Sequence, residues 1–147
     1  MYIRQLRSRG KCYMNRYESW LDRAKSSFEL SKATINKNIY LEDLCYQIQQ
    51  SVEKAFKGLL IYYGVEPEFT HNIGVLLFEL EKHTEVSERI KDAMDLTNYA
   101  VQTRYPGSYD EITKDEYEKA LKIAEEWLDW VNNKIKEEEN KKQNNKP

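Results

Sequence analysis

The chain has 147 residues and a net charge of −2, so it has the size of one domain and carries no overall signal for nucleic-acid binding. Gly occurs 5 times and Pro 3 times, a scarcity that favours long helices over a turn-rich sheet. Two cysteines exclude a disulfide framework, and no segment approaches the roughly 18 consecutive apolar residues of a membrane span, so we expect a cytoplasmic all-α protein.

The first 16 residues differ in charge from the rest of the chain. They hold five basic residues and no acidic residue. We expect residues 1–16 to form a basic arm without regular structure, because short terminal segments are commonly disordered. The alternative is an arm that contacts phosphates. Met14 is a second candidate start of the chain.

Apolar residues at helical spacing predict two long helices in the first half of the chain. The first is expected over residues 17–37, with Leu30 on the face opposite to the apolar one. The second is expected over residues 41–63 and ends at Gly64, a residue that commonly stops helices. Its apolar stripe consists of Leu41, Leu44, Cys45, Ile48, Val52, Ala55, Phe56, Leu59 and Tyr63.

A short third helix and a longer fourth helix follow a polar loop. The third begins at either Thr70 or Asn72. The fourth begins after Ser87, a suitable N-cap residue. It is expected to end near Arg104, because a proline at position 106 disfavours α geometry in the residue before it.

The last helix is predicted to begin after Thr113, with Glu116 completing a capping box, and to reach about residue 136. Residues 137–147 contain no apolar side chain and are expected to form a disordered polar tail. Residues 17–136 are therefore predicted to form an antiparallel four-helix up-and-down bundle with an additional short helix.

Arg104 is the first candidate functional residue, since helical periodicity places this cation on the inward face of the fourth helix. A buried arginine needs a carboxylate, a helix C-terminus or an anionic ligand. Glu53 and Glu111 are the candidate carboxylates, and periodicity alone does not separate a structural ion pair from a ligand site. Two tyrosines in the following loop, Tyr105 and Tyr109, are suited to stacking on bases, although tyrosines also commonly cap a bundle.

The second helix carries a polar face beside its apolar stripe. Such side chains usually form hydrogen bonds with neighbouring helices, and the alternatives are contact with another subunit or a place in the Arg104 groove. His71 and His83 are the only histidines, and we expect structural roles for both. Their spacing from the cysteines fits no zinc site, so no metal or other cofactor is expected. The polar face consists of Gln49, Gln50, Glu53 and Lys54.

Several short motifs, in order along residues 17–135, resemble the prokaryotic HEPN domain family. The resemblance implies a helical bundle that dimerises, with the arginine-bearing grooves at or near the dimer interface. Many members are encoded beside a minimal nucleotidyltransferase and act with it as a toxin–antitoxin pair. The matching motifs are Gln49-Gln50, Glu53-Lys54-Ala55, Gly64-Val65-Glu66-Pro67, Thr70-His71-Asn72 and Thr103-Arg104-Tyr105-Pro106.

Ribonucleases of the family pair an arginine with a histidine that follows after four to six intervening residues. Arg104 matches the arginine, whereas the permitted histidine positions hold Tyr109, Asp110 and Glu111. A histidine exchanges protons near neutral pH, which an ordinary phenol or carboxylate does not. The resemblance also makes Tyr109 a candidate site of adenylate modification by the partner enzyme.

We therefore predict a homodimer that binds a nucleotide, RNA or the nucleotidyltransferase and lacks the standard ribonuclease activity. One alternative is an atypical, metal-independent endoribonuclease toxin that uses Arg104, with Glu111 or His71 replacing the missing histidine. Another alternative is a structural adaptor that binds a protein through one face of the bundle.

Overall fold

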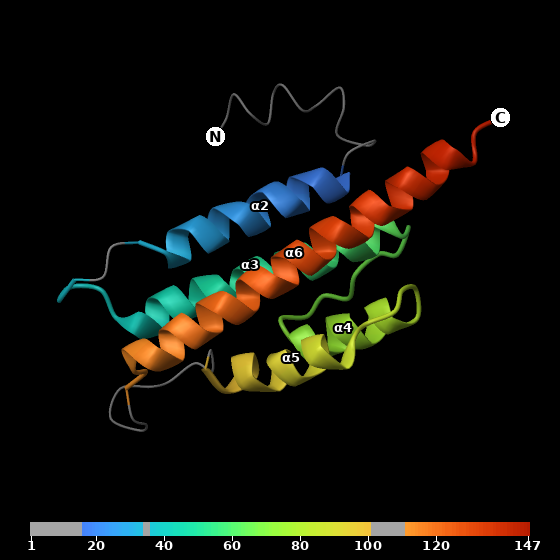
Figure 1. Ribbon diagram of the computed structural model, residues 1–147. Helices are drawn as coiled ribbons and strands as arrows, with labels where there is room; N and C mark the ends of the chain where they lie inside the picture. Colours follow the sequence, from blue (N-terminus) through green and yellow to red (C-terminus); the bar gives the residue numbers. More distant parts are fainter. Residues whose placement is uncertain (1–15, 34–35, 101–110) are drawn as a thin grey trace, which may run out of the picture.

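Helices are the only regular secondary structure in the part that the structure, a computed structural model, describes: residues 16–33, 36–100 and 111–147. Side chains are described within these ranges except at residues 95–100. This part contains no strand, which confirms the predicted all-α class (Figure 1). The helices are α2 (Arg16–Ser31), α3 (Leu41–Tyr62), α4 (Ile73–Glu81), α5 (Glu88–Ala100) and α6 (Lys114–Asn144).

Helix α3 occupies the centre of the bundle and packs against α2, α4 and α6, while α5 packs against α6. Figure 1 shows that α2 runs antiparallel to α3 and that α5 runs antiparallel to α6. The chain returns along the bundle after α3, so the short α4 runs in the same direction as α3. The long helices therefore alternate in direction along the chain, as predicted, and α4 is the additional short helix.

The core forms where the apolar stripe of α3 meets the inward face of α6. Phe56 and Trp127 are both fully buried, and their ring centroids lie 5.7 Å apart. The indole N–H of Trp127 donates to the Ile90 carbonyl oxygen at 3.2 Å, which ties α6 to the first turn of α5. Seven members of the predicted α3 stripe are buried: Leu44, Cys45, Ile48, Val52, Ala55, Phe56 and Leu59.

Glycines set the approach of α2 to α3 and the end of α3. A Cβ atom at Gly58 would lie 3.1 Å from Leu21 Cδ2 and 3.3 Å from the Tyr17 carbonyl oxygen, so the absent side chain permits close packing of the two helices. Gly64 has φ +79°, a left-handed conformation that glycine adopts without strain. The Val65 N–H then donates to the Leu60 carbonyl oxygen at 2.9 Å, which closes the helix end as predicted.

Side-chain caps fix the predicted starts of three helices. The Asn72 side chain accepts from two backbone N–H groups in the first turn of α4, which decides the start of that helix. The Ser87 hydroxyl oxygen accepts from the Ile90 N–H at 3.4 Å at the start of α5. Thr113 and Glu116 form the predicted capping box of α6. These local signals were readable in the sequence because each cap satisfies N–H groups within its own first turn.

Helix α2 ends earlier than predicted, at Ser31 instead of residue 37. The Tyr117 hydroxyl donates to the Ser31 carbonyl oxygen at 2.5 Å, and this bond from α6 satisfies a carbonyl at the end of α2. A turn follows, in which the Asn36 side chain accepts from the Asn38 N–H at 2.8 Å. Leu30 is 56% exposed, which confirms its predicted outward position.

Helix α6 continues to Asn144, so the disordered tail predicted from residue 137 is wrong over most of that segment. The Tyr62 hydroxyl donates to the Glu139 carboxylate at 2.5 Å, and Lys142 Nζ lies 3.2 Å from the Tyr62 hydroxyl oxygen. Lys142 also lies over the Tyr62 ring, 4.8 Å from its centroid. These contacts and strong intrinsic helix formers such as Lys and Glu replace the missing apolar stripe.

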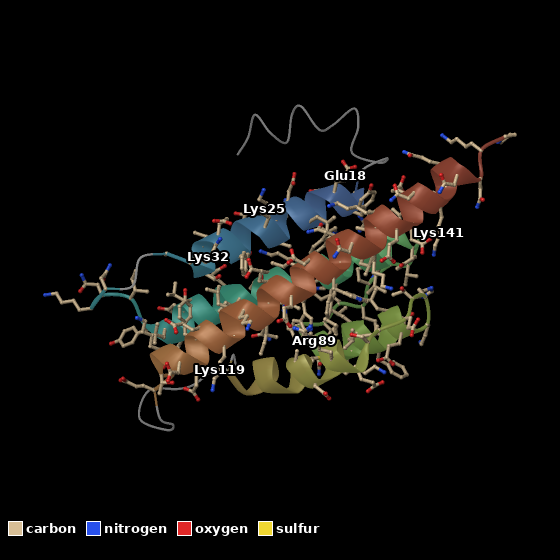
Figure 2. The ribbon with its side chains drawn as sticks, viewed as in Figure 1. Glu18, Lys25, Lys32, Arg89, Lys119 and Lys141 are labelled. Carbon is tan, nitrogen blue, oxygen red and sulfur yellow. The ribbon has the colours of Figure 1, made fainter. Side chains whose placement is uncertain are left out.

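Charged side chains cover the outer faces of the bundle. Figure 2 shows Glu18 and Lys25 along the side of α2 that faces away from the bundle. Arg89 at the start of α5 pairs with Glu126 on α6 at 3.1 Å. Among the described residues, no helix is long and apolar enough to cross a membrane.

Candidate functional site

The predicted site residues Arg104, Tyr105 and Tyr109 lie outside the described residues, and the structure gives the position of their flank. Glu111 is exposed at the end of the segment that carries them. The backbone N–H of the next residue, Ile112, donates to the Glu42 carboxylate at 3.0 Å. Glu42 belongs to the first turn of α3, so this flank is fixed to the N-terminal end of α3.

Glu53 is the most buried member of the predicted polar face, since its side chain is 4% exposed, and it has several partners. Lys57 Nζ lies 2.8 Å from Glu53 Oε1, and Gln50 Nε2 lies 3.3 Å from Glu53 Oε2. His71 Nδ1 lies 3.2 Å and 3.3 Å from the two carboxylate oxygens. A buried carboxylate is costly without partners, and these three side chains supply them from among the described residues.

The loop between α3 and α4 brings His71 to this carboxylate. The Thr70 hydroxyl oxygen accepts from the Asn72 N–H at 3.0 Å, and Asn72 in turn caps α4. His71 lies between these two residues in the chain. Its side chain is 80% exposed although Nδ1 points at the buried Glu53. The rest of the imidazole ring therefore faces solvent.

Two lysines of α3 link the polar face to α2. Lys54 Nζ donates to the Ser27 hydroxyl oxygen at 2.8 Å. Partial burial, and then the neighbouring Arg23 cation, lower the pKa of the Lys54 ammonium, while Glu53 partly offsets them. Lys57 Nζ lies over the Trp20 ring, 5.7 Å from its centroid. Lys54 thus contacts a neighbouring helix, whereas the hydrogen bond of Gln50 to Glu53 lies within α3.

The Glu53 cluster and the flank of the Arg104 segment share one face of α3. Glu42 and Glu53 are separated by about three helical turns, or roughly 16 Å along the axis, and this spacing returns to nearly the same side of the helix. Glu42 holds Ile112 and Glu53 holds His71. The two anchor points are therefore aligned along α3.

The described residues contain no group of three or more His, Cys, Asp or Glu side chains that could hold a metal ion. Cys45 is a buried thiol of the core. The chemistry that the described cluster offers is therefore that of an imidazole, an ammonium and a carboxylate.

The family model for the HEPN domain matches residues 17–136. The chain belongs to the HEPN family. Among curated proteins it is similar to "Putative toxin MJ1304" of Methanocaldococcus jannaschii, with 30% identity over 141 residues that cover 84% of this chain and 91% of that protein.

Two crystal structures share the fold of this HEPN chain. TT1696 from Thermus thermophilus matches with a TM-score of 0.71 and 29% identity, covering 82% of this chain and 99% of that chain. ST0689, described as an archaeal HEPN homologue, matches with a TM-score of 0.62 and 25% identity, covering 83% and 99%. The resemblance read from the sequence motifs is thus confirmed at the level of the family and the fold.

The pairing of Glu53 with His71 was not predicted. Glu53 was expected as a member of the polar face and as a candidate partner of Arg104, and His71 was expected to have a structural role or, in the alternative, to replace the missing histidine. The motif Glu53-Lys54 on a helix and the Thr70-His71-Asn72 turn were both noted as family features. Their contact depends on the return path of the α3–α4 loop, which no local pattern encodes.

Proposed function

We propose that this HEPN protein is a toxin-type homodimer that binds a phosphate-bearing ligand, a nucleotide or RNA, through Arg104 and lacks the standard ribonuclease reaction of its family. The observation that carries the proposal is the sequence from Arg104 to Glu111, which retains the arginine and places no histidine at positions 109–111. The comparison with the arginine and histidine pair of HEPN ribonucleases applies because the chain belongs to the HEPN family.

Phosphate binding and RNA cleavage place different chemical demands on the site. An arginine binds phosphate with fixed N–H donors and a permanent charge, and neither property depends on a neighbouring histidine. Proton transfer at neutral pH does depend on a group that titrates near 7. Positions 109–111 hold one phenol and two carboxylic acids, and ordinary side chains of these kinds do not exchange protons near pH 7. Binding is therefore expected to persist where cleavage is lost.

The toxin context is supported by the relative from Methanocaldococcus jannaschii that is named "Putative toxin MJ1304". We propose that the protein acts in the cytoplasm with a minimal nucleotidyltransferase as its partner, as the family resemblance implies. Tyr105 and Tyr109 would supply aromatic surfaces next to Arg104, and Tyr109 is the residue on which adenylate modification should be sought.

Binding of ATP and of a short single-stranded RNA to the purified protein tests the proposal. We expect the Arg104→Ala variant to bind about tenfold more weakly, as is typical for the loss of a charge-assisted hydrogen bond. Arg89→Ala is the matched control, because Arg89 is an arginine of α5 with an 80% exposed side chain that pairs with Glu126. It should change affinity by less than about twofold.

Two results would contradict the proposal. Absence of binding to both ATP and RNA, with or without the nucleotidyltransferase, would remove the ligand function and favour the adaptor alternative. RNA cleavage by the wild type that disappears in Arg104→Ala would show an active ribonuclease, and Glu111→Gln would then test the carboxylate as the replacement group. Sedimentation velocity measures the oligomeric state in the same preparations.

A further inference from the structure

The cluster of Glu53, Lys57 and His71 has a donor and acceptor pattern that fixes what it can bind. Glu53 is an acceptor only when it is ionised. His71 Nδ1 lies within hydrogen-bond distance of both its oxygens, so Nδ1 must carry the proton. In the neutral imidazole, Nε2 then has a free lone pair. The exposed edge of the neutral His71 ring therefore presents a hydrogen-bond acceptor.

Lys57 places donors beside this acceptor. Lys57 Nζ and His71 Nδ1 contact the same Glu53 oxygen, at 2.8 Å and 3.2 Å, so the two nitrogens are separated by no more than the sum of those distances. An ammonium group has three N–H donors, and Glu53 takes one of them. The cluster thus combines an outward acceptor, on the solvent side of the imidazole ring, with the Lys57 ammonium on the Glu53 side, where the Lys57 side chain is 12% exposed.

Phosphate oxygens accept hydrogen bonds and cannot donate to a neutral imidazole nitrogen, whereas a ribose hydroxyl can donate to it. A ligand that carries both groups is a ribonucleotide unit, and its 2′-hydroxyl is the group that distinguishes RNA from DNA. We infer that His71, oriented by Glu53, accepts a hydrogen bond from a ribose 2′-hydroxyl while Lys57 contacts the adjoining phosphate. This inference rests on the proposed function.

The cluster lies on the same face of α3 as the flank of the segment that carries Arg104. Ile112, at the end of the segment that carries Arg104, is held by Glu42. Glu53 lies roughly 16 Å further along the same face of α3. An extended single strand of a few nucleotides spans such a distance. A single nucleotide would occupy only the subsite at His71. Because RNA and free ATP both carry a ribose hydroxyl and a phosphate, either could supply the ligand at this subsite.

The test compares four probes by fluorescence or calorimetric titration of the full chain: a short RNA, the DNA of the same sequence, ATP and dATP. We expect the wild type to bind the ribose form about fivefold more tightly than the deoxyribose form, as one hydrogen bond allows. His71→Ala should abolish that preference while changing affinity for the DNA by less than about twofold. A ribose preference in the RNA and DNA pair identifies RNA as the ligand. A ribose preference in the ATP and dATP pair identifies the free nucleotide as the ligand.

His83→Ala is the matched control, because His83 is the other histidine and lies 3.9 Å from a carboxylate, that of Glu79. It should leave the ribose preference unchanged. Glu53→Gln removes the group that orients His71 and should also lower the preference. Glu53→Gln loses a buried ion pair and could therefore fail to fold. In that case the result for His71→Ala, a substitution of an exposed side chain, decides the test.

A merely structural role for His71, as a tie between the α3–α4 loop and α3, gives a different result. His71→Ala would then weaken the ribose and deoxyribose probes equally or affect neither, and either outcome overturns the inference. If Arg104→Ala weakens RNA binding in the same series, the proposed function stands while this inference fails. If the wild type binds none of the four probes, both fail.

Discussion

Substitution of Tyr117 by Phe isolates the contact that ends α2. The Tyr117 side chain is nearly buried, and burial first, then Cys45 and Glu118, raise the pKa of its phenol, so the hydroxyl keeps its proton and donates to the Ser31 carbonyl oxygen at neutral pH. Ser31 is 0% exposed. In Tyr117→Phe, water cannot readily replace the lost donor, and the carbonyl stays buried without it.

The expected cost is about 2 kcal/mol, since it combines a lost hydrogen bond with a buried acceptor that loses its partner. For a domain of this size, that value lowers the melting temperature by about 7 °C. Urea unfolding followed by far-UV circular dichroism measures the free energy, and the slope with denaturant should not change. Tyr40→Phe is the control, because Tyr40 is 69% exposed and should change stability by less than about 0.5 kcal/mol. Equal stability of the two variants would refute the role assigned to the Tyr117 hydroxyl.

Three further predictions concern the helix contact, the helix cap and the C-terminal end of α6. Gly58→Ala should lower stability by about 1 kcal/mol, because the crowding against Leu21 outweighs the gain in helix propensity; a stabilised variant in urea unfolding would contradict this. Thr113→Ala should cost about 1 kcal/mol in the same assay through loss of the capping box, and an unchanged midpoint would show that the cap contributes nothing. The Tyr62 hydrogen bond first, and then Lys142, lower the pKa of the Glu139 carboxyl. The ionised Glu139 therefore stabilises the fold above the pKa that its carboxyl has in the unfolded chain, near 4.5. This stabilisation is lost as the pH falls through the lower pKa that the carboxyl has in the folded protein. Tyr62→Phe should raise the pKa of Glu139 in an NMR titration, and the stability difference between wild type and variant should shrink in acid; a pH-independent difference would count against the linkage.

Much of the fold could be predicted because the deciding signals are local. The α3 stripe repeats at helical spacing, Gly64 stops that helix, and Thr113 with Glu116 begins α6. Each of these signals determines the structure of residues only a few positions away along the chain. Binary patterning of this kind is what a single sequence records most directly.

The errors arose where contacts between distant segments decide the outcome. The end of α2 is set by Tyr117, 86 positions away along the chain, and the last turns of α6 are held by Tyr62. Neither bond leaves a periodic signal. The candidate site follows the same rule, since the motifs that contain Glu53 and His71 could be recognised separately but their contact could not. Arg104 stays a prediction.

The aromatic contacts at one end of the bundle bring the start of α2 and the end of α6 together. The Tyr17 and Tyr62 ring centroids lie 5.0 Å apart, and Tyr62 also binds Glu139. The Arg104 flank lies at the opposite end, beside Glu42 (Figure 1). Residue 16 and residue 144 could therefore be joined by a short linker and the chain reopened at the turn near Asn36, giving a circular permutant that keeps all five helices. A fluorescent protein fused at the C-terminus would likewise project away from the end where the ligand is expected.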